Sequence, residues 1–157
     1  DLLEQFGGHK YAAGLTIKIE NIPEFRTRFE AIVAETLDDE LLIPELKIDA
    51  EVGITDLTTE FYSIISKFAP YGPGNMKPVF VSKGLKNTGR SMLVGAERQH
   101  LKVHAIQGGS YPMDGIAFNM REKFEHLKQD TFDCCYSLNM NDHNGIRKLQ
   151  MQIKDIL

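Results

Sequence analysis

The stretch YGPGNMKPVF, residues 71–80, marks the point at which the character of the sequence changes. Two prolines, two glycines and an asparagine within its first eight residues are typical of turns and loops. Just before it, apolar residues recur at helical spacing. After it, short alternating stretches follow one another, each bounded by Gly, Asn or Pro. The stretch therefore separates a helix from a region built mainly of strands.

Downstream of this loop, the alternation of apolar and polar residues predicts strands and one short helix. The predicted strands cover residues 79–85, 91–96, 100–107, 113–119, 132–140 and 147–156, and the predicted helix covers residues 121–127. The sequence NDHNG, residues 141–145, is typical of a hairpin between the last two strands. Five or six short, mostly antiparallel strands with one helix predict a small closed or partly open β-barrel.

Upstream of the loop, strands and helices alternate. Alternation predicts strands over residues 15–20 and 46–52. A first helix is predicted from Asn21, with Glu24 at capping-box spacing and Pro23 tolerated in the first turn, to a point near residue 37. A second helix begins at residues 55–59, and its expected apolar stripe is Phe61, Ile64, Ile65 and Phe68.

The acidic segment DDELLIP, residues 38–44, predicts a boundary between two units, residues 1–43 and 44–157. The expected class is α+β: a short αβ segment followed by a small barrel with one or two helices. The sequence begins in mid-pattern without an initiator Met and without a visible signal peptide, which predicts a piece of a longer protein. The longest apolar runs are too short to span a bilayer.

Composition sets further limits. The 157 residues are 42% hydrophobic and 25% charged, which is ordinary for a globular protein. Cys134 and Cys135 are adjacent on a predicted strand, so their side chains should point to opposite faces. We interpret both as structural, and a reducing cytoplasm as the expected compartment.

A basic block interrupts an otherwise acidic chain whose net charge is −4. Residues 71–104 hold six Lys or Arg against Glu97 alone, a net +5. Within the block, strand spacing puts His100, Lys102 and His104 on one face and apolar residues on the other. This face is either a solvated outer surface or a groove that tracks phosphates. The candidate nucleic-acid-binding residues are Lys83, Lys86, Arg90, Arg98, His100, Lys102 and His104; candidate stacking aromatics are Tyr71, Tyr111 and Phe80, the last more consistent with a core residue.

A second feature lies near the start of the chain, in FGGHKYAAG, residues 6–14. Gly7 and Gly8 predict a tight turn whose free amides could hold an anion, with His9 as an added donor. The alternative is a turn followed by close backbone packing, with His9 an ordinary surface residue.

The chain shows no catalytic apparatus of its own. It contains no HExxH motif and no pair of CxxC motifs, and no Ser, Cys or Thr has a recognisable nucleophile context. Asp142 and His143 lie in the predicted hairpin turn, which explains them without a metal. We therefore expect no catalytic residue and no metal site in these residues.

Two motifs resemble those of a known family. FGGHKYAAGLTI is similar to the GGH-x-x-AAG signature of DHHA1 domains, the substrate-gripping half of DHH phosphoesterases. YGPGNMKPVF is similar to the PFGPGN-x-x-PVF junction of the RecJ family of single-strand-specific exonucleases. The resemblance continues through HLK, residues 100–102, and MDGIAFN, residues 113–119, and covers essentially the whole chain. Phe6 departs from the pattern, because many DHHA1 domains have glycine there.

This resemblance implies a C-terminal part of such an exonuclease, with the end of a DHHA1 domain at residues 1–43 and an OB-like domain at 44–157. It implies that Gly7, Gly8 and His9 contact a substrate phosphate. It also implies 5′ to 3′ hydrolysis of single-stranded DNA, in DNA repair and recombination, by a DHH domain in cis that holds Mn²⁺ or Mg²⁺. Single-strand-binding protein or a helicase would be further partners, and no membrane is expected.

Other interpretations stay open at this point. One is a free-standing binding module without a nuclease parent. Another is the tail of a DHH-family phosphodiesterase that cleaves oligonucleotides or cyclic dinucleotides. A third is an OB-like module that docks proteins, which the acidic residues 45–60 would suit.

Overall fold

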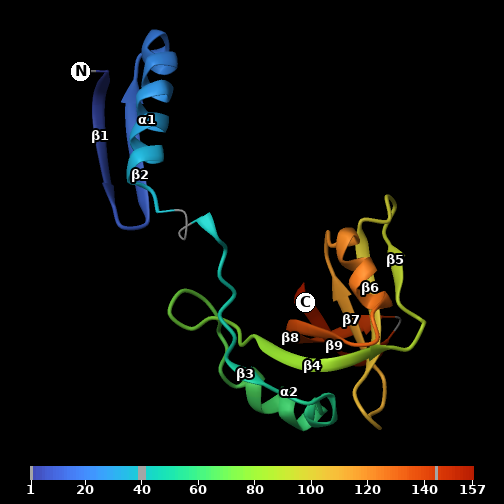
Figure 1. The fold of residues 1–157 in the computed structure, drawn as a ribbon. Coiled ribbons are helices and arrows are strands. Elements are labelled where there is room, and N and C mark those ends of the chain that lie inside the picture. Colours follow the sequence, from blue (N-terminus) through green and yellow to red (C-terminus); the bar gives the residue numbers. More distant parts are fainter. Residues whose placement is uncertain (1, 39–41, 144) are drawn as a thin grey trace. The chain divides into compact units, whose positions relative to one another are not determined.

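The computed structural model describes residues 2–38, 42–143 and 145–157 of the chain. The chain divides into two compact units, Asp1–Leu46 and Lys47–Leu157 (Figure 1). This division lies three residues beyond the boundary expected from the acidic segment. Among the described residues, no helix has the length and apolar character needed to cross a membrane.

The first unit is a hairpin with one helix. Strands β1 (Leu3–His9) and β2 (Ala12–Ile17) pair antiparallel, and a 3₁₀ turn (Ile19–Asn21) leads into helix α1 (Ile22–Thr36). Figure 1 shows α1 running alongside the hairpin. None of the described residues of this unit is buried, and several of its large apolar side chains are exposed. The described part of the unit therefore has no closed core of its own.

Two predictions, one about the second strand and one about the helix start, need correction. The strand expected at residues 15–20 begins at Ala12 instead and ends at Ile17. The capping box is wrong, since the Asn21 side chain caps no helical amide. It donates instead to the Leu2 carbonyl oxygen at 3.2 Å, which ties the start of α1 to the start of the hairpin. Pro23 does occupy the first turn, as expected.

The second unit is built on a seven-stranded sheet. Its strands are β3 (Ala50–Glu51), β4 (Phe80–Asn87), β5 (Met92–Val94), β6 (His100–Ile106), β7 (Met113–Ala117), β8 (Phe132–His143) and β9 (Ile146–Ile156), in the order β3-β4-β8-β9-β7-β6-β5. An additional pairing of β4 with β6 joins β4, β8, β9, β7 and β6 into a ring. All pairings are antiparallel except β3 with β4 and β7 with β9. This confirms a mostly antiparallel, OB-like fold.

A bend in β4 makes the ring possible. The register of β4 against β8 shifts between Ser82 and Leu85, and Gly84 within the shift has a φ of +63°. Glycine adopts this left-handed conformation without the penalty other residues suffer. The Asp133 carboxylate accepts a hydrogen bond from the Gly84 amide at 2.9 Å. The first part of β4 therefore pairs with β8, and its end, at Lys86 and Asn87, pairs with β6.

The core lies inside this ring, as the alternation of the sequence indicates. Leu101, Val103 and Ala105 of β6 are completely buried, and the residues between them are not. Gly115 of β7 is buried too, and a Cβ there would lie 2.8 Å from the Ile153 Cδ1 atom. The prediction that residues 101, 103 and 105 face the core is confirmed.

The two connecting helices of this unit differ from the prediction, α2 in its length and the later one in its type. Helix α2 (Thr59–Ser66) begins at Thr58, whose hydroxyl accepts from the Phe61 amide at 3.1 Å. Ile65 is buried and Phe61 packs against the core, but Ile64 and Phe68 of the expected stripe are exposed. The helix expected at residues 121–127 is a 3₁₀ helix, Arg121–Lys128.

The strand expected at residues 46–52 reduces to the two residues of β3, which lie along the edge of β4. The predicted hairpin after β8 is present, with His143 opposite Ile146. Its strands are longer than expected, because residues 141–143 belong to β8 and not to the turn. Asn144, part of the predicted turn, lies outside the described residues.

Asn75 stabilises the loop of residues 71–79, which precedes β4. Its side-chain amide donates to the carbonyl oxygens of Phe68, at 2.8 Å, and Pro70, at 2.9 Å. The Tyr71 hydroxyl donates to the Ile65 carbonyl oxygen at 2.7 Å. The loop is thereby anchored to the end of α2 and delivers the chain into β4.

A buried pair of hydroxyl groups joins β3, β4 and β8. The Ser82 hydroxyl donates to the Val52 carbonyl oxygen at 2.6 Å, so it accepts from the Tyr136 hydroxyl, 2.7 Å away. Tyr136 is fully buried, and this burial raises its pKa to about 12. The bonds fix the segment before α2 on the barrel.

Tyr136→Phe tests this arrangement through its pH dependence. At pH 8 we expect the substitution to lower the free energy of unfolding by about 1 kcal/mol, the usual net value of one hydrogen bond. The folded protein keeps the Tyr136 proton to a higher pH than the unfolded chain, in which tyrosine titrates near pH 10. The wild type should therefore lose this part of its stability as the pH rises from about 10 toward 12.

The measurement is urea denaturation of both proteins between pH 8 and pH 11.5. The difference between wild type and Tyr136→Phe should shrink above pH 10, since only the wild type carries the tyrosine. A difference that stays constant over this range would contradict a buried Tyr136 hydroxyl.

Candidate nucleic-acid interface

The outer face of β6 carries the three residues that strand spacing places there. Lys102 is exposed, while His100 and His104 are half-buried. In the sheet, Lys102 lies between Met92 of β5 and Ile116 of β7. The Lys102 ammonium has no ion-pair partner among the described residues. It is therefore available to an anion from outside the protein.

The outer face of β7 adds apolar surface beside this charge. Ile116 pairs with Lys102, and Asp114 pairs with His104. Phe118, just past the end of β7, is 52% exposed, and its ring meets the His100 ring edge-on at a centroid distance of 5.2 Å. Sequence reasoning did not single out Phe118. The alternation Asp114, Ile116, Phe118 within the predicted strand would have placed it on this face.

The two histidines already have partners within the protein. His104 Nδ1 lies 2.5 Å from the Thr88 hydroxyl, and its backbone amide donates to the Ser91 hydroxyl at 2.9 Å. His100 Nδ1 accepts from the Asn119 amide at 3.1 Å. Their rings therefore help to fix the β4–β5 connection and the end of β7, and Lys102 is the flexible cation between them.

A hollow of about 200 Å³ opens beside Lys102. It lies between β6, β7 and the β8–β9 hairpin, and Lys148 supplies a second cation to its wall. The lining residues are Lys102, Asp114, Asn141, Ile146, Lys148, Leu149 and Gln150. Apolar, amide and cationic groups meet here beside the Asp114 carboxylate, a mixed lining that suits the base and backbone of a nucleotide better than a free inorganic anion.

The other basic candidates lie on different elements. Arg90 precedes β5, and Arg98 lies in the β5–β6 connection with a φ of +54°. Lys86 is exposed near the end of β4. Lys83 is ion-paired with Glu51 at 2.8 Å, and this hydrogen bond raises its pKa. The structure thus gives Lys83 a partner within the protein, whereas Lys86, Arg90 and Arg98 have no ion-pair partner among the described residues.

The candidate aromatics differ in their surroundings. Phe80 is 6% exposed and stacks obliquely on Phe61, which confirms the expectation that it belongs to the core. The Tyr71 hydroxyl is bound to α2, as described above. Tyr111 is 93% exposed in the β6–β7 connection, away from the strand pair that carries Lys102 and Phe118.

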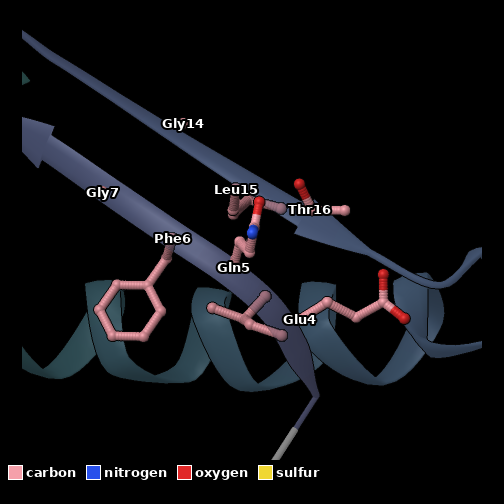
Figure 2. A pocket seen from close by; sticks show the side chains of 8 residues that line it. Glu4, Gln5, Phe6, Gly7, Gly14, Leu15 and Thr16 are labelled. Atoms are coloured by element: carbon pink, nitrogen blue, oxygen red, sulfur yellow. The ribbon is translucent and has the colours of Figure 1, made fainter.

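The glycine motif of the first unit does not form the predicted turn. Gly7 and Gly8 lie inside β1, where they pair with Gly14 and Ala13 of β2 (Figure 2). A Cβ on Gly8 would lie 2.9 Å from Ala13 Cα and from the Ala12 carbonyl oxygen, so close cross-strand approach explains this glycine. Glycine suits such approach as well as it suits a turn, and local sequence does not separate the two.

His9 ends β1, and the chain reverses at Lys10 and Tyr11. The His9 Nδ1 atom accepts from the Tyr11 amide at 3.3 Å, which leaves Nε2 as the nitrogen that carries the proton in the neutral ring. The ring is exposed, so Nε2 can donate to a group outside this unit.

Cys134 and Cys135 are free thiols and both are buried, which agrees with a structural role, and burial raises the pKa of each. Within the described ranges, no three His, Cys, Asp or Glu side chains gather as metal ligands would. These residues therefore do not fit a metal site, and no step of metal-assisted chemistry is assigned to them.

Comparison with known proteins gives this geometry a family. Residues 48–155 match the family model described as the RecJ OB domain. The chain is 33% identical over 157 residues to the single-stranded-DNA-specific exonuclease RecJ of Bacillus subtilis and 32% identical over 160 residues to that of Escherichia coli. Each match covers 99% of this chain but 20% and 26% of the relative. The chain thus spans a fifth to a quarter of these proteins.

A solved structure supports the fold. The crystal structure of RecJ in complex with Mn²⁺ from Thermus thermophilus matches with a TM-score of 0.72 at 23% identity. The match covers 99% of this chain and 22% of that one. The chain belongs to the RecJ family and contains its OB domain.

Proposed function

We propose that this chain is the part of a RecJ-like exonuclease that holds and guides single-stranded DNA, while hydrolysis takes place in another part of a longer protein. The observation that carries the proposal is the outer face of β6 and β7. There Lys102, which has no ion-pair partner in the described part of the chain, lies near an exposed ring, Phe118, on the strand pair that OB-folds use to bind oligonucleotides.

The face combines the two interactions that bind single strands without reading sequence. Lys102 attracts a backbone phosphate, with Lys148, Arg90 and Arg98 on neighbouring elements. Phe118 and Ile116 offer apolar surface to a base, and every base has a face that stacks. Binding by this face should therefore tolerate any sequence and weaken with salt.

The first unit has a different proposed role. Residues 1–43 would be the end of a DHHA1 domain, and Gly7, Gly8 and His9 would contact a substrate phosphate near the catalytic DHH domain. The exposed apolar groups of this unit support this, since Phe6, Phe29 and Ile32 are each more than half exposed. Monomeric proteins seldom leave large apolar patches uncovered, so the preceding part of the same domain would cover them.

The parent protein would be a cytoplasmic, metal-dependent 5′ to 3′ exonuclease of DNA repair and recombination, with Mn²⁺ or Mg²⁺ in its DHH domain. Two crystal structures of RecJ from Thermus thermophilus are complexes with Mn²⁺ and with Mg²⁺. Single-strand-binding protein or a helicase would deliver its substrate.

Lys102→Gln tests the proposed DNA face. We expect binding of a fluorescein-labelled dT₁₂ oligonucleotide, measured by anisotropy, to weaken several-fold at about 0.1 M salt. The slope of log K against log salt should fall in magnitude by about 0.7, the value for one phosphate contact on a single strand. Lys83→Gln is the matched control, because its ammonium is paired with Glu51, and it should change neither quantity appreciably.

If wild type and Lys102→Gln bind dT₁₂ with equal affinity and equal salt slope, β6 is not the DNA track. If the wild type binds no oligonucleotide even at low salt, the proposed function of the barrel is wrong.

Phe118→Leu tests base stacking separately from charge. Stacking on an aromatic side chain contributes about 1–3 kcal/mol per base, so we expect at least a five-fold loss of affinity for dT₁₂. The salt slope should stay unchanged because no charge is removed. Tyr111→Leu removes a more exposed ring from the β6–β7 connection and should have no effect. Equal losses for the two variants would show that Phe118 is not a specific platform.

His9→Ala tests the glycine motif and requires the full-length nuclease that carries these residues. We expect turnover of single-stranded DNA to fall by about ten-fold or more with an unchanged melting temperature, because among the described residues the exposed His9 ring takes part in one hydrogen bond, which it accepts from the Tyr11 amide. Gly8→Val should instead lower stability, because its Cβ would collide with β2 backbone atoms. Normal turnover in a folded His9→Ala enzyme would make His9 an ordinary surface residue.

A further inference from the structure

Two lysines from distant parts of the sequence lie within electrostatic range of each other beside β8 and β9. Lys77 comes from the loop before β4, in the YGPGNMKPVF stretch, and Lys154 comes from β9. In the β8–β9 ladder, Tyr136 is opposite Ile153 and Cys135 is opposite Asp155. Lys154 is therefore the extra residue of a β-bulge, a feature that re-aims a side chain and is common beside functional sites.

Side-chain hydrogen bonds hold the Lys77 ammonium in place. Lys77 Nζ donates to Asn139 Oδ1 of β8, and Asn139 Nδ2 donates to Gln152 Oε1 of β9 at 2.6 Å. Because the Asn139 amide is oriented by both neighbours, the ammonium is fixed at one place on the sheet. One of its three protons is used by Asn139, and the other two remain for further acceptors.

The electrostatics of this lysine pair favour the binding of an anion. Neither Lys77 nor Lys154 forms an ion pair within the described residues, and the nearby Asp155 is taken by Lys123 at 2.8 Å. Lys77 is half-buried, and burial together with the Lys154 charge lowers its pKa. Two like charges held together without a counter-ion cost free energy, which a bound anion would recover.

The pair is also continuous with the face that holds Lys102. Ile116 lies beside Lys102 in the β6–β7 ladder, and Gln152 lies beside Ile116 in the β7–β9 ladder. Gln152 is the residue bound to Asn139 and hence to Lys77. From β6 to β8 the path crosses three strand spacings, about 15 Å in all. An OB-fold site of about 4–16 nucleotides can cover that distance.

We propose that Lys77 and Lys154 form a second phosphate-binding site, which holds the backbone of the same single strand after it leaves the β6–β7 face. The inference rests on the proposed DNA-binding function of the barrel. It defines the path of the DNA across the sheet, from β6 over β7 and β9 to β8. It also assigns the loop before β4 a contact with DNA in addition to its structural anchoring through Asn75.

The test uses the whole 157-residue chain and labelled dT₆ and dT₁₂ oligonucleotides. The variants are Lys77→Gln, Lys154→Gln and the double substitution, and glutamine at residue 77 keeps a donor for Asn139. The control is Lys18→Gln with Lys67→Gln, which removes the same net charge from the first unit and from the end of α2. Melting temperatures verify that each variant is folded, and exposed Lys154 can be replaced without touching the core.

We expect the double variant to bind dT₁₂ about ten-fold more weakly than wild type, with a salt slope smaller in magnitude by about 1.4, or 0.7 for each lost contact. Its affinity for dT₆ should change less than two-fold, so the gain from dT₆ to dT₁₂ should largely disappear. Lys154→Arg should keep wild-type affinity and slope.

Three results would overturn the inference. In the first, the double variant matches the charge control for dT₁₂ while Lys102→Gln weakens binding, so that the proposed function survives and the second site does not. In the second, the double variant loses dT₆ and dT₁₂ equally, so the lysines do not extend the track. In the third, wild type binds no oligonucleotide, which removes the proposed function and the second site together.

Discussion

The barrel depends on the bend in β4 at Gly84. Each β-strand has two edges. One edge of β4 pairs with β8, and the other edge pairs with β6 at the end of β4. A residue with a side chain would adopt the left-handed φ of +63° only at a cost, and a Cβ added at Gly84 would meet no atom of the described residues within 4 Å that could offset this cost. The Asp133 carboxylate satisfies the amide that the bend removes from the ladder. Without the bend, residues 86–87 at the end of β4 and residues 105–106 at the end of β6 would lose their pairing with each other.

Closure of the ring then determines what faces outward. Once Leu101, Val103 and Ala105 fill the interior, Lys102 has to point outside, since neighbouring residues of a strand lie on opposite faces. On β7 the buried residues are Gly115 and Ala117, and Met113 packs against the core while only partly buried. Ile153 occupies the space that a larger residue at 115 would need. At Gly115 the core is therefore filled by Ile153 of β9, while Ile116 and Phe118 lie on the outer face.

This coupling explains which parts of the structure the sequence predicts. Strict alternation on β6 predicts both its core and its outer face. The same rule fails on β4 and β8, where residues 80–82 and 134–138 are buried without a break. The Gly7-Gly8 pair predicts a turn, but the structure places Gly8 inside β1, where the close approach of Ala13 on β2 requires glycine. Asn21 has the spacing of a cap, yet the Leu2 carbonyl oxygen competes for its side chain. A local sequence pattern does not show which residue from another element will contact a given side chain, so neither of these two contacts could be predicted.

The charges follow the same logic, and they decide how an acidic chain can present a cationic track. The net charge of −4 is a sum over the whole chain, whereas an approaching phosphate senses the cations within a Debye length, about 8 Å at physiological salt. Within the described residues, three lysines form ion pairs: Lys83 with Glu51, Lys123 with Asp155, and Lys128 with Glu125. Counting Lys and Arg along residues 71–104 therefore overestimates the useful charge at Lys83. The same count misses Lys148 and Lys154, which β9 brings to the outer surface of the barrel from forty or more residues away.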